Sequence, residues 1–132
     1  MIVVDASVIA NAVGDDEDAG RIARRRLREV DEVAAPDLLD VETVAVLQRA
    51  WLKGGLSDER FAAAVDDLLA LPIRRLPTGP LMPRAFALRA NVTAYAACYV
   101  ALAEALGWRL VTADARLATA PTIECAVEVL TV

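Results

Sequence analysis

Acidic side chains end or follow several short apolar runs of this chain. Asp5 closes the N-terminal apolar run, Glu42 follows the run around residues 36–39, and Asp114 ends the run 110–113. In an α/β protein the carboxyl ends of parallel strands share one edge of the sheet, and ligands bind there. We therefore expect the three acids to face a common site at that edge.

Carboxylates gathered in this way need a counter-charge. Two unit charges ~4 Å apart repel by about 4 kcal/mol at an effective dielectric of 20, so a folded protein rarely keeps such a cluster for stability alone. Oxygen ligands suit hard cations such as Mg²⁺ and Mn²⁺. An ion of this kind lowers the pKa of a bound water and stabilises charge on a phosphoryl oxygen. The pattern therefore indicates metal-dependent phosphoryl chemistry.

Each acid also has a structural interpretation. Asp5 could be the N-cap of the helix that follows it, Asp114 could cap a short turn, and Glu42 could be a solvated helix residue. The apolar neighbours of Asp5 and Glu42 favour function, whereas chemistry and capping are equally supported at Asp114. We interpret Asp37 and Asp40, which flank Glu42, as surface or capping residues.

The composition fits one domain spanning residues 1–132 and excludes several kinds of chemistry. Single cores usually contain ~100 to 200 residues, and 57% of this chain is hydrophobic, with only 6 Gly and 6 Pro. Because the chain has no His, it cannot form a Ser-His-Asp triad or an H-E-x-x-H zinc site. Cys98 and Cys125 lie far apart in sequence, and we expect both to be buried reduced thiols.

Net charge and hydropathy limit the partners and the location. The net charge of −5, from 19 acidic and 14 basic residues, differs from that of non-specific nucleic-acid binders, which are usually basic. This charge is compatible with a transient nucleic-acid substrate whose phosphate is bridged by a divalent cation, or with a protein that binds no nucleic acid. It is also compatible with a basic protein partner. No apolar stretch reaches the ~18 residues of a membrane span, and no basic region of a signal peptide precedes the first apolar run. We therefore expect a cytoplasmic protein.

Short apolar strands alternate with longer helical segments, which is typical of a parallel sheet covered by helices on both faces. We predict strands at 2–4, 32–35, 73–76, 109–112 and 126–130. We predict helices at 7–13, 18–30, 39–52, 58 to about 71, 81–90 and 93–106. Ser57 is a favourable N-cap, and Gly107 is a C-terminal stop signal.

Four segments together resemble the PIN-domain ribonucleases, and more narrowly the VapC-type toxins of bacterial toxin-antitoxin pairs. They span nearly the whole chain in the family's order: Ile2-Val-Val-Asp-Ala-Ser-Val8, Ala35-Pro-Asp-Leu-Leu-Asp-Val-Glu42, Thr93-Ala-Tyr-Ala-Ala-Cys-Tyr-Val-Ala-Leu-Ala-Glu104 and Leu110-Val-Thr-Ala-Asp114. The resemblance implies a three-layer α/β/α domain with a central parallel sheet, and endonucleolytic cleavage of RNA with Mg²⁺ or Mn²⁺. It also implies a homodimer that a cognate antitoxin inhibits. It assigns metal-site roles to Asp5, Glu42 and Asp114, and a supporting hydroxyl to Ser7 or Thr112.

One position departs from the family's pattern. Family members usually carry Asp directly after the Tyr of the segment Thr93-Ala94-Tyr95, whereas this chain has Ala96. With Thr93 as the N-cap, position 96 is N3, where an acid would lie near the sheet edge. Because Ala96 supplies no oxygen, we predict low or absent nuclease activity.

Two explanations of Ala96 compete. Either the change was introduced to disarm a toxic enzyme, or the natural protein is degenerate and serves through binding. The otherwise intact set of acids favours the first explanation. The second corresponds to an alternative function, a non-catalytic PIN-like module that binds an antitoxin and regulates its own operon.

The helix 18–30 is rich in arginine, and its basic side chains have two interpretations. The first is a solvated face opposite the apolar positions. The second is that Arg24 and Arg25 make forked contacts with RNA phosphates or with acidic groups of an antitoxin.

Overall fold

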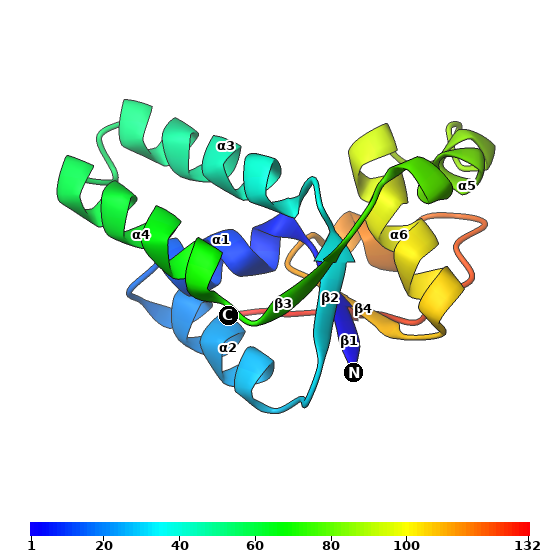
Figure 1. Cartoon of the computed structure of the whole chain (residues 1–132), viewed down its shortest axis with the longest axis horizontal. Helices are drawn as coiled ribbons and strands as arrows, with labels where there is room; N and C mark the ends of the chain where they lie inside the picture. Colours follow the sequence, from blue (N-terminus) through cyan, green and yellow to red (C-terminus); the bar gives the residue numbers. More distant parts are fainter.

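The computed structural model describes residues 1–132 as strands alternating with helices (Figure 1). The strands are β1 (Ile2–Val4), β2 (Val33–Pro36), β3 (Ile73–Leu76), β4 (Arg109–Thr112) and β5 (Val127–Val129). The α-helices are α1 (Ala6–Gly14), α2 (Asp18–Arg28), α3 (Leu39–Leu52), α4 (Asp58–Ala70), α5 (Met82–Ala87) and α6 (Ala94–Leu106). Two 3₁₀ helices, η1 (Gly79–Leu81) and η2 (Ala115–Thr119), complete the chain.

The five strands form one sheet in the order β3-β2-β1-β4-β5, and all neighbours pair in parallel. The chain winds from β1 through β2 to β3 on one side, and then returns to place β4 on the other side of β1. The winding therefore reverses between β1 and β4. In open α/β sheets, ligands bind beyond the carboxyl ends of the strands at this switch point.

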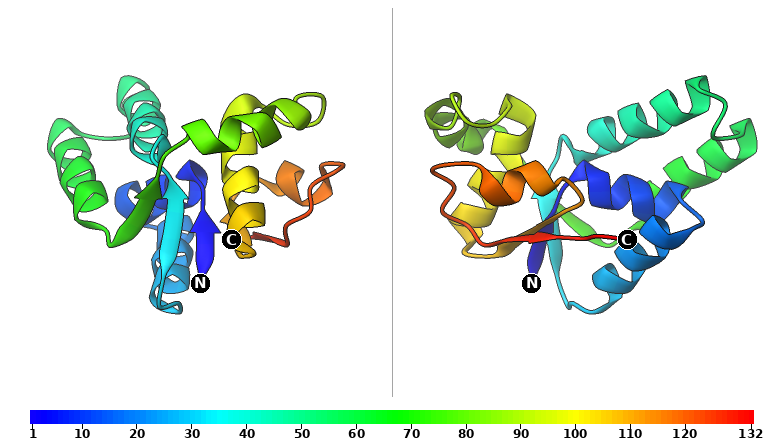
Figure 2. Two further views of the ribbon diagram at one scale, coloured as in Figure 1. Left: turned by 45° about the vertical axis from the view of Figure 1, so that its right-hand side comes forward. Right: turned by 180° about the vertical axis from the view of Figure 1, so that it is seen from behind.

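Helices cover both faces of the sheet (Figure 2). α6 packs on one face against β1, β2 and β4, with α5 beside it, whereas α1 lies on the other side with α2, α3 and α4 around it. Every residue of α6 from 97 to 103 is buried, as expected for a helix that is apolar on all sides. The predicted three-layer α/β/α architecture is confirmed. None of the helices combines the length and the apolar character that crossing a lipid bilayer requires.

Local capping signals set most helix ends. The Ser57 hydroxyl accepts from the amide of Arg60 and begins α4. Gly107 ends α6 in the left-handed region with φ 68°, where a side chain would add strain. The helix predicted at 81–90 is shorter and divided: η1 and α5 follow each other with Pro80 and Pro83 in their first turns, and α5 ends at Ala87. Proline is tolerated there because its missing N–H has no intrahelical partner.

The cysteines take no part in a disulfide. Cys98 is buried in α6, Cys125 is half-buried, and both are free. The prediction of reduced thiols is confirmed, although Cys125 is less buried than expected.

Candidate active site

Asp5 lies directly after β1 and is the N-cap of α1, with its side chain only 8% exposed. One oxygen, Oδ1, accepts from the amides of Ser7 (3.1 Å) and Val8 (3.4 Å) and from the Ser7 hydroxyl. The other oxygen, Oδ2, accepts from the hydroxyl of Thr112. The capping role of Asp5 is therefore real, and the same carboxylate faces the switch point of the sheet.

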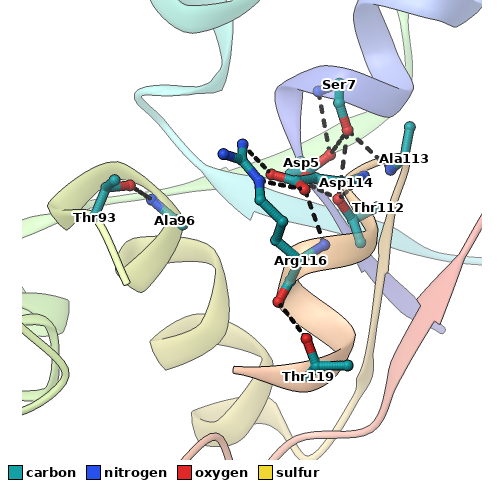
Figure 3. A network of polar contacts seen from close by, with 9 residues as sticks. All are labelled: Asp5, Ser7, Thr93, Ala96, Thr112, Ala113, Asp114, Arg116 and Thr119. Carbon is teal, nitrogen blue, oxygen red and sulfur yellow. Dashed lines mark hydrogen bonds and ion pairs between the residues drawn. The ribbon is translucent and has the colours of Figure 1, made fainter. Parts of the chain in front are cut away.

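Two hydroxyls connect the ends of β1 and β4 (Figure 3). Ser7 Oγ also accepts from the amide of Ala113 at 2.9 Å, and Thr112 Oγ1 accepts from the amide of Asp114 at 3.0 Å. Each hydroxyl thus donates to Asp5 and accepts from the backbone after β4. Both hydroxyls predicted to support the site are in contact with Asp5, so the orientation of that carboxylate is fixed from two sides.

Burial raises the pKa of Asp5, and the hydrogen bonds from Ser7 and Thr112 only partly oppose this effect. A buried carboxylate that must ionise is stabilised by a nearby positive charge. None of the contacts of Asp5 is with an arginine or lysine. The charge at the end of β1 is therefore balanced by hydrogen bonds alone.

Glu42 lies in the first turn of α3, next to the same edge of the sheet. It is half-buried, and its Oε1 accepts from the hydroxyl of Tyr99 on α6 at 2.7 Å. Burial raises the pKa of Glu42, and the charge of Asp5 adds to this rise. Asp5 therefore lies near enough to Glu42 for its charge to act on that carboxyl.

Asp114 has a different environment. It is the N-cap of η2, and its carboxylate forms a fork with the guanidinium of Arg116, at 3.0 Å from Nε to Oδ1 and 2.8 Å from Nη2 to Oδ2. The hydrogen bond from Arg116 lowers the pKa of Asp114. The capping interpretation is again correct, and an arginine already neutralises this acid.

Position 96 lies across a cavity from Asp114. Thr93 is the N-cap of α6, and its Oγ1 accepts from the amide of Ala96 at 3.1 Å, which confirms the predicted N3 position. Ala96, Asp114 and Arg116 all line one cavity of about 200 Å³. Figure 3 shows Thr93 and Ala96 on the helix that faces the Asp114 turn. An acid at position 96 would share this cavity with Asp114.

The four positions define the edge site, which consists of Asp5, Glu42, Asp114 and Ala96. No group of three His, Cys, Asp or Glu side chains lies close enough to hold one metal ion. The charge of Asp5 acts on Glu42, while Asp114 is held by its arginine and position 96 has no oxygen. Carboxylate oxygens are suitable ligands for a hard divalent cation. In this arrangement, however, too few of them lie together to surround one ion.

The remaining predicted residues have structural contacts or are exposed. Asp37 is exposed, and Asp40 forms an ion pair with Arg75 at 2.9 Å, so neither joins the edge site. Arg24 is half-buried, and its Nη1 donates to main-chain carbonyl oxygens of the α1 end at 3.0 and 2.8 Å. Arg25 is exposed.

Sequence reasoning missed two residues of the site. Tyr99 follows position 96 by three residues on one helix, and this spacing places both on the same face. The spacing could therefore have identified Tyr99. No comparable pattern pointed to Arg116, because an exposed arginine after a strand has many possible partners.

The fold and the edge site define a family. The family model of the PIN domain matches residues 2–122, and the chain belongs to this family. Within it, the chain is of the VapC type. It is 41% identical to Ribonuclease VapC1 of Mycobacterium tuberculosis over 129 residues. This alignment covers 97% of this chain and 96% of that protein. The resemblance found in the sequence is confirmed.

Solved structures share the fold at lower identity. The structure of Mycobacterium tuberculosis VapC20, described as a sarcin-ricin loop cleaving toxin, matches with a TM-score of 0.69 and 19% identity, over 87% of this chain and 91% of that chain. A second match is the structure of VapBC2 from Rickettsia felis, which is bound to a DNA fragment from the VapBC2 promoter. It matches with a TM-score of 0.68 and 15% identity, over 99% of this chain and 100% of that chain.

Proposed function

We propose that this chain is a metal-dependent endoribonuclease toxin of a toxin-antitoxin pair, with its activity impaired by Ala96. The observation that carries the proposal is the placement of two half-buried or buried acids, Asp5 directly after β1 and Glu42 in the first turn of α3, at the carboxyl edge of a parallel sheet. The similarity to Ribonuclease VapC1 over nearly the whole chain supports RNA as the substrate.

In this proposal Asp5, Glu42 and Asp114 hold Mg²⁺ or Mn²⁺. When bound, such an ion activates a water and neutralises charge on the scissile phosphate. The Ser7 and Thr112 hydroxyls keep the Asp5 carboxylate oriented towards the strand ends, and the N-terminus of α1 favours its negative charge. For Asp114 to join the ion, Arg116 must release at least part of its fork.

Ala96 explains the proposed loss of activity. The side chain at this position reaches the cavity beside Asp114 without an oxygen. Asp at position 96 would place a second carboxylate beside that of Asp114, which Arg116 neutralises. Two negative charges would favour a divalent cation over the single positive charge of the guanidinium. We propose that this fourth acid completes the ion's ligands.

The proposed partners are a cognate antitoxin, an RNA substrate and a second copy of the chain. The similarity to VapBC2, described with promoter DNA, supports an antitoxin partner and a role at an operon. The alternative, a non-catalytic module that acts only through antitoxin binding, needs no cation.

The test is restoration of the fourth acid. Ala96→Asp should give RNA cleavage that depends on Mg²⁺ or Mn²⁺ and stops with EDTA. Ala94→Asp is the matched control, because it adds the same charge to the same helix turn at an exposed position and should not restore cleavage. An Ala96→Asp protein that folds normally but neither binds Mn²⁺ nor cleaves RNA would contradict the proposal. Retained antitoxin binding would then favour the non-catalytic module.

A further inference from the structure

Tyr99 is the only side chain that hydrogen-bonds the Glu42 carboxylate. The residue is 2% exposed, in the fully buried part of α6, and its hydroxyl donates to Glu42 Oε1 at 2.7 Å. The bond connects α6 with α3 across 57 residues of sequence. The second carboxylate oxygen, Oε2, accepts no hydrogen bond within the chain. The contact therefore fixes one oxygen of Glu42 and leaves the other free.

We infer that Tyr99 is a positioning residue of the proposed cation site, where it holds the Glu42 carboxylate so that the free oxygen can serve as a ligand. The inference rests on the proposed function. Carboxylates that bind metal ions are commonly hydrogen-bonded by outer residues that fix their orientation, and loss of such a partner typically lowers metal affinity ~10- to 100-fold.

The choice of partner distinguishes this role from core packing. A buried tyrosine hydroxyl needs an acceptor, and a main-chain carbonyl would satisfy it without any buried charge. Tyr99 instead donates to a half-buried carboxylate that lies within electrostatic reach of Asp5. A bond to a charged acceptor is stronger than one to a neutral carbonyl, so the contact holds the carboxylate firmly, but it brings no positive charge to offset the Asp5 charge that acts on Glu42. This arrangement is useful if a cation joins the two acids.

The position of Tyr99 on α6 supports the same role. Tyr99 lies three residues after Ala96, so both are on one face of the helix. Position 96 lines the cavity beside Asp114, and Tyr99 holds Glu42. When position 96 is Asp, this face of α6 would supply one ligand directly. One turn later, the Tyr99 hydroxyl on the same face would orient a second ligand, Glu42.

The experiment measures Mn²⁺ affinity of the full chain by electron paramagnetic resonance, in an Ala96→Asp background. Tyr99→Phe removes only the hydroxyl and should lower Mn²⁺ affinity ~10-fold or more. Tyr95→Phe is the matched control, because Tyr95 is 63% exposed on the same helix and bonds to no acid. It should leave Mn²⁺ affinity unchanged. Thermal unfolding of each variant verifies the fold.

A second pair of variants tests whether Tyr99 acts through Glu42. Glu42→Gln should itself lower Mn²⁺ affinity, and adding Tyr99→Phe to it should cause little further loss. If Tyr99→Phe binds Mn²⁺ as tightly as its parent while Glu42→Gln does not, the inference is wrong and the proposed site stands. An equal loss from Tyr99→Phe in both backgrounds also overturns it. If Glu42→Gln has no effect, the proposed site fails, and the inference fails with it.

Discussion

Thr112 donates a hydrogen bond from its Oγ1 to Oδ2 of Asp5 and so joins the end of β4 to the end of β1. The two residues are 107 positions apart in sequence, yet parallel pairing of β1 with β4 brings their strand ends together. The bond is at the switch point of the sheet, where the fold leaves room for a ligand. The geometry of the acid therefore depends on a neighbouring strand as well as on its own helix.

Thr112→Val should destabilise the protein. Valine keeps the shape of the fully buried side chain but leaves Asp5 with one donor fewer, and it also removes the acceptor of the Asp114 amide. We expect the free energy of unfolding to fall by about 1 to 3 kcal/mol, measured by urea denaturation at neutral pH. Thr131→Val, at an exposed position, is the control. Equal stability of the two variants would mean that the Thr112 bond contributes nothing.

Thr43→Val should have the opposite effect. Thr43 is 0% exposed in α3, and its hydroxyl has no hydrogen-bond partner. A buried donor without a partner is unfavourable by about 1 to 3 kcal/mol, and valine fills the same space without it. Urea denaturation should therefore give a higher free energy of unfolding. A clear loss of stability would show that the hydroxyl has a partner, such as a buried water molecule.

Arg116→Ala should release Asp114. The hydrogen bond from Arg116 holds the pKa of Asp114 below its usual range, so this pKa should rise when the guanidinium is removed. NMR titration of the Asp114 carboxyl measures this change, with Arg28→Ala as a control at another exposed arginine. Asp114 stays ionised at neutral pH in both proteins, so the rise will appear only in acid. An unchanged titration would mean that the fork does not form in solution.

The ion pair of Glu104 with Arg84 should make stability depend on pH. The Arg84 hydrogen bond lowers the pKa of Glu104 below its ordinary 4.5. The stabilisation is therefore fully present above pH 4.5 and is lost as the pH falls through the lower, folded-state value. Glu104→Gln should unfold at lower urea concentration than the parent at pH 7.

The same comparison at acid pH provides the check. Once Glu104 is protonated in both folded and unfolded chains, it resembles Gln, so the two proteins should differ much less in urea midpoint. Glu29→Gln, at an exposed position with no ion pair, should show no such dependence. A Glu104→Gln deficit of the same size at both pH values would contradict the assigned pKa shift.

The sequence predicted the strand ends and the helix N-cap around the site well, because these positions depend on local signals. The strand ends at Val4 and Thr112 and the N-cap at Thr93 are where the apolar runs and the capping pattern indicated. Parallel pairing then requires the acids that follow those strands to share an edge. We expected three carboxylates around one ion, but no three acidic side chains lie close enough together to hold an ion, and Asp114 pairs instead with an arginine two residues away.

Side-chain partners across the fold could not be predicted from the sequence. The bond between Tyr99 and Glu42 joins two helices whose contact depends on how each packs against the sheet. α5 ends at Ala87, and no glycine or proline in residues 88–90 marks that end in the sequence. Neither feature can be read from hydrophobic periodicity, which contains no information about tertiary contacts or about the last turn of a short helix.

The two arginines predicted to contact RNA or antitoxin should behave differently. Arg24 donates to the main-chain carbonyls of Ala12 and Asp15 and so satisfies the end of α1. Arg24→Met should therefore lower the free energy of unfolding by about 1 to 3 kcal/mol, whatever partner is present. Arg25 is exposed and forms no ion pair. Its guanidinium is free to meet a phosphate or carboxylate.

Arg25→Glu should therefore keep the stability of the parent while weakening one interaction. Fluorescence anisotropy with labelled RNA and with labelled antitoxin, measured separately, identifies which partner the residue meets. A loss confined to RNA would assign α2 to the substrate, whereas a loss confined to antitoxin would assign it to inhibition. Unchanged affinity for both partners would restore the interpretation of α2 as a solvated face, because reversing a charge at a true contact replaces attraction with repulsion.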